Sequence, residues 1–159
     1  MARVKGDGSW VESCRVRKVR QDDPLGCGVA CVAMITGREY AAVRQLFLDA
    51  QIGTRKGRPL ATNFTELQKA LALLGVDCQR KRFEGWDSIQ GVGILAVDSR
   101  DGGNNSWHRV VVERHPRYGV VLHDPDFPLP SFSDKTPAGI RSHPFTEYQA
   151  RKSWLCVTD

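Results

Sequence analysis

One segment constrains the fold of this chain more than any other. Residues 26–36 are an almost unbroken run of small and apolar residues that stops at Gly37. Glycine just past the last helical residue is a common helix terminator, and a helix that is apolar on most of its faces is a buried one. The sequence therefore predicts a buried helix, with Cys27 in its first turn.

Helices are predicted first along the chain and strands afterwards. Residues 40–50 carry apolar side chains at helical spacing, and Asn63 followed by Glu66 forms a capping box that opens a helix ending before Gly75. The spacing then becomes that of strands, which are expected at residues 76–83, 92–97, 107–113, 118–124 and 154–157, with a further short one near 14–19. This order is typical of an α+β fold in which N-terminal helices pack on an antiparallel sheet.

Length and composition favour one globular domain. The chain has 159 residues, 41% hydrophobic and 26% charged, which suits a single domain over residues 1–159 with a polar lead-in over 1–20 and a variable segment over 126–159. No apolar run approaches the roughly 18–20 residues of a membrane span. Residues 1–10 also lack the apolar stretch of a signal peptide. We therefore expect a chain without a membrane span.

The cysteines predict neither disulfides nor a metal site. There are five of them, and neither their odd number nor their spacing forms a disulfide framework. Because no pair has the CxxC spacing of zinc ligands, no metal and no cofactor is expected. Free thiols in a chain without a leader segment favour a reducing, cytoplasmic setting.

The net charge of +5 comes largely from three basic clusters, within residues 15–20, 55–58 and 80–82. Such clusters are typical of a solvated surface. Attraction to an acidic partner or to nucleic acid is the alternative. Aromatic residues are not interleaved with the basic ones, which disfavours nucleic acid.

Cys27 has the placement of a nucleophile. The positive end of a helix dipole lowers the pKa of a thiol, and Gly26 and Gly28 on either side would let a substrate backbone approach closely. Core packing is the alternative for a small residue in a buried helix, and it is what we expect for Cys31 one turn later. Gln21 could donate its amide to an oxyanion beside the Cys27 N–H, or could simply be solvated.

His108 is the strongest candidate for a general base among four histidines. It begins an apolar strand, and Asp124 ends the next strand. In a hairpin symmetric about residue 116 the two would lie directly opposite, with Cβ atoms about 4.5–5.5 Å apart, so that the carboxylate could orient the imidazole. His123 would point to the opposite face, while His115 and His143 are expected in a turn and a loop.

The order Gln, Cys, His, Asp resembles that of the bacteriocin-processing (double-glycine leader) peptidases, a family of the papain-like clan. The resemblance is carried by residues 21–35 (QDDPLGCGVACVAMI), 57–76, 108–112 (HRVVV) and 120–125 (VVLHDP). It implies a papain-like fold without a cofactor. It also implies that Cys27 is the nucleophile, His108 the general base, Asp124 the group that orients the histidine, and Gln21 part of the oxyanion hole.

The implied function is that of a bacterial cysteine peptidase acting on a peptide or protein substrate, with a leader peptide as one candidate. The chain departs from the family where Gly26 replaces the usual Asp, where Arg109 replaces an aromatic or apolar residue, and in an added loop at residues 99–106. No transporter membrane domain or ATP-binding motif is recognised, so a stand-alone domain is expected. Deamidation, acyl transfer, and peptide binding without turnover remain open alternatives, and the sequence predicts no oligomeric state.

Overall fold

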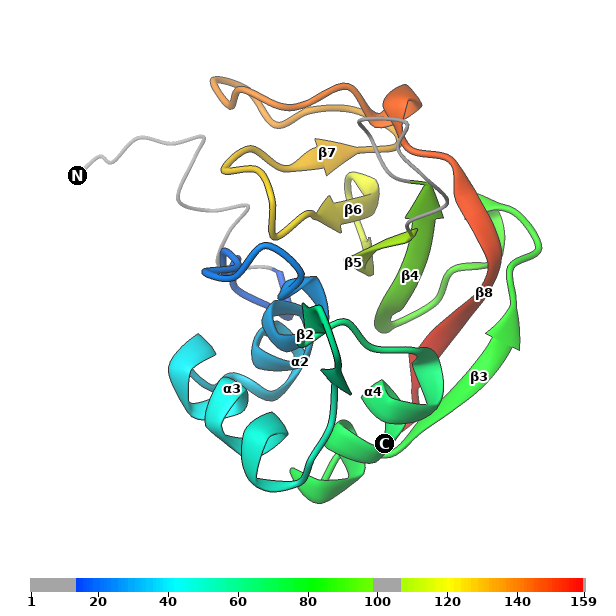
Figure 1. Ribbon diagram of the computed structural model, residues 1–159. Coiled ribbons are helices and arrows are strands. Elements are labelled where there is room, and N and C mark those ends of the chain that lie inside the picture. Colours follow the sequence, from blue (N-terminus) through cyan, green and yellow to red (C-terminus); the bar gives the residue numbers. More distant parts are fainter. Residues whose placement is uncertain (1–13, 99–106, 159) are drawn as a thin grey trace.

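A computed structural model describes residues 14–98 and 107–158 (Figure 1). Its helices come first in the chain, and they are α2 (Cys27–Thr36), α3 (Tyr40–Asp49) and α4 (Phe64–Leu73). The longer strands are β3 (Cys78–Arg82), β4 (Val92–Asp98), β5 (Trp107–His115), β6 (Gly119–His123) and β8 (Ala150–Val157). The short elements are β1 (Thr54–Arg55), β2 (Arg58–Pro59), β7 (Ser131–Phe132), and the 3₁₀ turns η1 (Trp86–Ser88) and η2 (Phe145–Glu147).

These strands build an antiparallel sheet that the helices cover on one side (Figure 1). The strand order is β3-β8-β4-β5-β6-β7, so the last strand of the chain inserts between two earlier ones. Strand β8 is longer than predicted because it pairs on both sides, with β3 and with β4. The expected α+β architecture is confirmed, and no helix of the described residues is both long and apolar enough to cross a membrane.

The sheet is buried on both faces, which explains its continuous apolar strands. Ile94 and Val111 face the helices, while Leu95 and Val110 pack into a second cluster with Trp154 on the far face. Successive side chains of a strand point to opposite faces, so a strand covered on both sides has no polar positions to alternate with. The C-terminal segment, predicted only as variable, supplies part of the far cover through residues such as Tyr148.

The register of the β5–β6 hairpin differs from the expected one. Val111 pairs with His123 and His115 with Gly119, so the hairpin is symmetric about Arg117 and not about residue 116. The reason lies in the turn, a three-residue loop followed by Gly119 in the left-handed conformation at φ 76°. Continued by one residue, this register places Asp124 opposite residue 110, two positions from His108 and on the same face of the strand.

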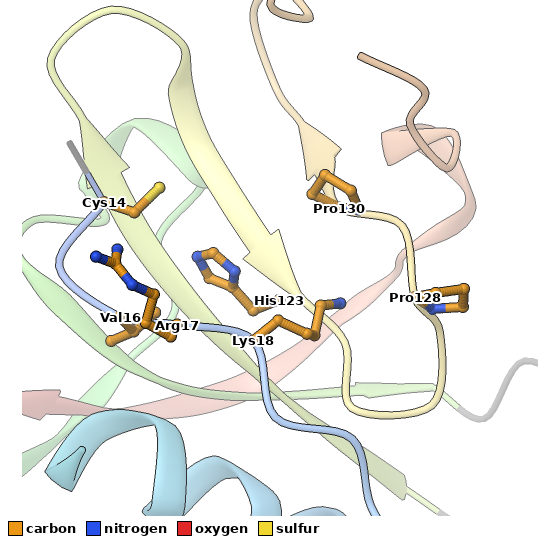
Figure 2. A pocket seen from close by; sticks show the side chains of 7 residues that line it. All are labelled: Cys14, Val16, Arg17, Lys18, His123, Pro128 and Pro130. Atoms are coloured by element: carbon orange, nitrogen blue, oxygen red, sulfur yellow. The ribbon is translucent and has the colours of Figure 1, made fainter. Parts of the chain in front are cut away.

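The short strand expected near residues 14–19 is wrong, because this segment bonds to side chains and loop carbonyls and not to a strand ladder. The backbone N–H of Arg15 donates to Glu113 Oε2 at 2.6 Å, and Lys18 Nζ donates to the carbonyl oxygens of Asp124 and Phe127 at 2.8 and 2.9 Å. Figure 2 shows the segment alongside β6, with Cys14 and Lys18 on the same side as His123. The lead-in is thus tied to the end of the hairpin.

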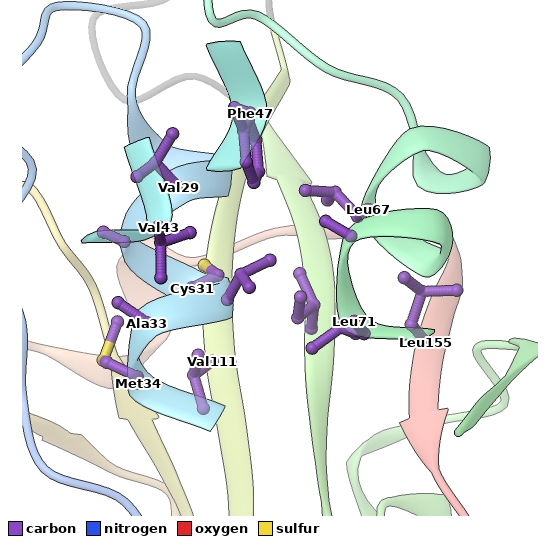
Figure 3. Packing of buried hydrophobic residues seen from close by; sticks show 14 of the residues in the cluster. Val29, Cys31, Ala33, Met34, Val43, Phe47, Leu67, Leu71, Val111 and Leu155 are labelled. Carbon is purple, nitrogen blue, oxygen red and sulfur yellow. The ribbon is translucent and has the colours of Figure 1, made fainter. Parts of the chain in front are cut away.

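The predicted buried helix is confirmed in α2. The five residues from Val29 to Ala33 are all 0% exposed, and Figure 3 shows Val29, Cys31 and Ala33 packed between α3 and the sheet, near Phe47, Val43 and Val111. The capping box of α4 is also confirmed, with Glu66 N donating to Asn63 Oδ1 at 2.8 Å and Asn63 N to Glu66 Oε1 at 3.0 Å. Leu67 and Leu71 of α4 complete this core.

Candidate active site

Cys27 is the first residue of α2, where the helix leaves the core. No side chain among the described residues caps this helix end, and the first turn carries no acidic residue. The first N–H groups of a helix lack partners within the helix. The positive end of the dipole and these donors therefore lie beside Cys27, a residue that is half-buried.

His108 and Asp124 meet at the end of the β5–β6 hairpin. His108 Nε2 and Asp124 Oδ1 lie 2.6 Å apart, and the His108 and Asp124 side chains are 13% and 1% exposed. The contact is diagonal across the strands, which long side chains can span. The contact forms although the register differs from the expected one. Moving the hairpin centre by one residue moves the residue opposite Asp124 by two, from His108 to residue 110, and residues two apart in a strand lie on the same face.

A second bond joins His108 to the helix. The Cys27 side chain is hydrogen-bonded to His108, and since Nε2 is turned to Asp124, Nδ1 is left for the thiol. The structure thus brings together three of the four predicted site residues, from α2, β5 and the residue after β6.

The electrostatics favour a thiolate–imidazolium pair. Burial by itself would raise the pKa of Cys27, but its hydrogen bond to His108 and the charges of His108 and Arg109 lower it below the usual thiol value. Burial opposes the charge on His108 as well, yet its bonds to Asp124 and Cys27 raise the pKa of His108 to about 10. Burial by itself would raise the pKa of Asp124, but the bond from His108, the charge of His108 and the bonds from the Asp126 N–H and the Tyr148 hydroxyl together lower it.

Arg109, the residue that departs from the resemblance, lies at the site. It is 8% exposed, donates from Nη2 to the Thr62 carbonyl oxygen at 2.8 Å, and stacks over the Phe64 ring at 5.3 Å. Its charge and its backbone N–H both lower the pKa of Cys27. An arginine after the histidine therefore contributes positive potential to the nucleophile.

Gln21 lies in the loop that enters α2, with its amide turned into that loop. Nε2 donates to the carbonyl oxygens of Asp23 and Pro24, both at 3.1 Å. Its buried Oε1 has no hydrogen-bond partner among the described residues. The amide therefore braces the turn before Cys27, and donation to an oxyanion would require it to exchange one of these bonds.

Of the remaining histidines and cysteines, His123 and Cys31 lie as expected, whereas His115 lies in a strand and not in the expected turn. His123 points away from Asp124 and bonds Glu113 Oε1 at 3.2 Å through Nε2. His115 ends β5, and its Nδ1 accepts from the Arg117 backbone N–H in the turn. Cys31 is fully buried, and burial raises its pKa well above the ordinary value, so it stays a thiol in the core.

Sequence reasoning missed two residues that hold Asp124. The Tyr148 hydroxyl donates to Asp124 Oδ2 at 2.7 Å in a buried contact, and Lys18 Nζ donates to the Asp124 carbonyl oxygen. The two residues come from the variable segment and from the polar lead-in. Neither segment carries a local pattern that would single them out.

Together these groups can perform nucleophilic acyl chemistry. A thiolate at a helix start, an imidazolium bonded to it and a buried carboxylate on the far ring nitrogen form the arrangement that covalent catalysis by cysteine requires. The arrangement by itself does not distinguish among peptide hydrolysis, deamidation and acyl transfer.

The fold is that of a known class of papain-like peptidases. The chain is similar in structure to a double glycine motif protease from an AMS/PCAT transporter, solved in complex with the leader peptide. The TM-score is 0.55 at 18% sequence identity, and the match covers 90% of this chain and 91% of the other. No protein-family model matches the sequence, and no curated protein does either. The likeness establishes the papain-like fold.

Proposed function

We propose that this chain is a cysteine peptidase in which Cys27, His108 and Asp124 form the catalytic triad. The observation that carries the proposal is the bonded series from the α2 thiol through the His108 ring to the buried Asp124 carboxylate. The likeness to a double glycine motif protease supports it, since that protein has the same fold.

In the proposed reaction the Cys27 thiolate attacks the carbonyl carbon of a peptide bond. The oxyanion forms beside the Cys27 backbone N–H at the start of α2, where the helix dipole stabilises it. His108 gives its proton to the leaving amine, and a thioester remains on Cys27. His108 then takes a proton from water, the resulting hydroxide attacks the thioester, and the thiolate leaves as the acid product departs.

Gln21 is proposed as the second oxyanion donor. Its Nε2 now bonds the carbonyls of Asp23 and Pro24, and the proposal requires that substrate binding replaces one of these bonds. Gln21→Glu removes the donor and retains the shape. We expect this variant to form the acyl-enzyme at least about 100-fold more slowly, the typical effect of losing an oxyanion donor.

The proposed substrate is a peptide with small residues at the cleavage site. The support is the likeness to a double glycine motif protease that was solved with the leader peptide. Gly26 and Gly28 themselves pack against the chain, since a Cβ at Gly26 would meet Tyr40 and one at Gly28 would meet Thr62 and Leu67. A leader peptide that ends in two glycines is therefore the first substrate to test.

The test uses two reagents on the full chain: a synthetic peptide with an internal Gly-Gly followed by a fluorogenic amine, and a Gly-Gly peptide vinyl sulfone. Wild type should release the amine and should form one adduct, on Cys27. Mass spectrometry of the products separates hydrolysis from deamidation, because only hydrolysis divides the peptide.

Two substitutions complete the test. Cys27→Ala should abolish both release and adduct, whereas Cys78→Ser, at a half-buried thiol of β3, should preserve both. Release that survives Cys27→Ala, or a wild-type chain that gives neither product nor adduct, would refute the proposed peptidase.

A further inference from the structure

A second cluster of reactive side chains lies apart from the triad, against β5 and β6. Cys14, Glu113 and His123 are all buried, and one donor atom of each lies within 4.8 Å of the other two. Cys14 lies far in the sequence from Glu113 and His123, which are ten residues apart on adjacent strands, so spacing gave no sign of a site. A thiol, a carboxylate and an imidazole that converge inside a protein form the donor set of a borderline-soft metal ion.

The separations suit a small tetrahedral ion. Zinc binds nitrogen, oxygen and sulfur at about 2.0–2.3 Å, so two ligands of a tetrahedral site lie roughly 3.3–3.8 Å apart. His123 Nε2 and Glu113 Oε1 are 3.2 Å apart, joined by a hydrogen bond that the ion would replace. Closing the site therefore requires a small movement of Cys14, which lies at the start of the lead-in.

The charges of the three ligands match a divalent cation, and the positively charged Lys18 and Arg17, which line an adjoining cavity, oppose its binding. One thiolate and one carboxylate would neutralise an ion of charge +2, and Cys14 would release one proton as the metal–sulfur bond forms.

Space for a fourth ligand adjoins the cluster. A cavity of about 210 Å³ is lined by Cys14 and His123 together with Lys18, Pro128 and Pro130 (Figure 2). This volume holds several waters, since a water occupies about 30 Å³ in the liquid. The ion would thus have three protein ligands and one water, the pattern of a zinc site with an open position.

We propose that Cys14, Glu113 and His123 bind one zinc ion, with water from the adjoining cavity as the fourth ligand. The ion ties the lead-in to the hairpin that carries His108 and ends at Asp124, because His123 directly precedes Asp124. The site stands apart from Cys27 and His108 and does not depend on the proposed peptidase activity.

Cobalt is the probe for this site, because a cobalt–thiolate bond gives a near-ultraviolet charge-transfer band that zinc abolishes. The full chain, freed of metal with a chelator, is titrated with Co²⁺ and then with Zn²⁺. We expect one Co²⁺ per chain, a thiolate band, release of one proton, and a higher melting temperature with Zn²⁺ than with Mg²⁺.

Three variants assign the ligand. Cys14→Ser should remove the band and weaken zinc binding at least about 100-fold, since losing a group that merely supports a ligand already costs roughly 10–100-fold. Cys27→Ser and Cys78→Ser should keep the band. Far-ultraviolet circular dichroism checks that each variant is folded.

Two results would overturn the proposal. One is a folded wild-type chain that shows no thiolate band at stoichiometric Co²⁺. The other is a band that survives Cys14→Ser and disappears in Cys27→Ser, which would place the metal on the triad. Neither result requires a measurement of hydrolysis, so failure of the zinc site can be distinguished from failure of the proposed peptidase activity.

Discussion

At the scale of single residues, Arg109 is the most informative departure from the expected pattern. Its side chain is buried with two kinds of partner, the Thr62 carbonyl oxygen and the Phe64 ring. Its positive charge lowers the pKa of Cys27 from within the site. An aromatic residue at this position could pack on Phe64 but could not supply that charge.

Arg109→Met should therefore raise the apparent pKa of Cys27 alkylation. Removing a nearby positive charge favours the neutral thiol, and each unit of increase reduces the thiolate fraction about tenfold at pH values below the pKa. The measurement is the pH profile of iodoacetamide labelling of Cys27.

Arg80→Met is the matched control, because Arg80 stacks over the same Phe64 ring at 5.3 Å and is not among the largest causes of the Cys27 pKa shift. Its profile should coincide with that of wild type. Equal shifts in both variants would mean that packing on Phe64, and not charge, is responsible.

Much of the site could be predicted at this scale, but for differing reasons. Cys27 follows from an apolar run with a defined start, which is a local pattern. The His108–Asp124 contact depends only on the two side chains lying on the same face of the hairpin. It was therefore predicted correctly, although the predicted hairpin centre differs by one residue from the observed one. Tyr148 and Lys18 reach Asp124 through tertiary contacts that no spacing encodes.

At the scale of elements, α4 holds α2 in place through one face. Leu71 is 0% exposed within the main core, whereas Leu73, two positions later on the same helix, is 53% exposed. One face of α4 is therefore buried, with Leu67, Ala70 and Leu71, and the other is exposed.

Leu71→Ala should lower the free energy of unfolding by about 2–5 kcal/mol, because it leaves a cavity beneath α2. Leu73→Ala should change it by less than about 0.5 kcal/mol. Urea denaturation followed by circular dichroism gives both values, and similar values for the two variants would contradict this packing of α4.

At the scale of the whole molecule, Asp124 is contacted by two segments that lie near opposite ends of the described chain. The lead-in supplies Lys18, and the segment before β8 supplies Tyr148. Cys27 lies on a helix and His108 lies on a strand of the sheet. The bonds from Lys18 and Tyr148 therefore hold Asp124 where the helices and the sheet meet. The sequence predicted the layers from local patterns, but the insertion of β8 between β3 and β4 is a long-range pairing that it did not reveal.

Tyr148→Phe should test this convergence. Losing a buried hydrogen bond to a charged group should lower the free energy of unfolding by about 1.5–3 kcal/mol and should also slow labelling of Cys27, through the looser Asp124–His108 pair. Tyr118→Phe, in the separate cluster with Cys14, Val121 and Phe132, should leave the labelling rate unchanged. Loss of stability in Tyr148→Phe without slower labelling would mean that the bond serves only the fold.

The central claim is that Cys27 is held as a thiolate by protonated His108. Because the pKa of Cys27 is lowered, the thiolate persists at pH values below the ordinary pKa of a thiol. Because the pKa of His108 is raised to about 10, its imidazole stays protonated up to about that pH. Cys78 is an internal control, because burial, then Asp77 and Cys156, raise its pKa.

The most direct measurement is the rate of iodoacetamide labelling of each cysteine in the folded, chelator-treated chain as a function of pH, read by peptide mass spectrometry. We predict rapid labelling of Cys27 near pH 6, well below the free-thiol pKa of about 8.5, in wild type but not in His108→Ala, while Cys78 is labelled only at alkaline pH. If Cys27 is labelled near pH 6 no faster than in the urea-denatured chain, the thiolate–imidazolium pair does not exist and the account is wrong.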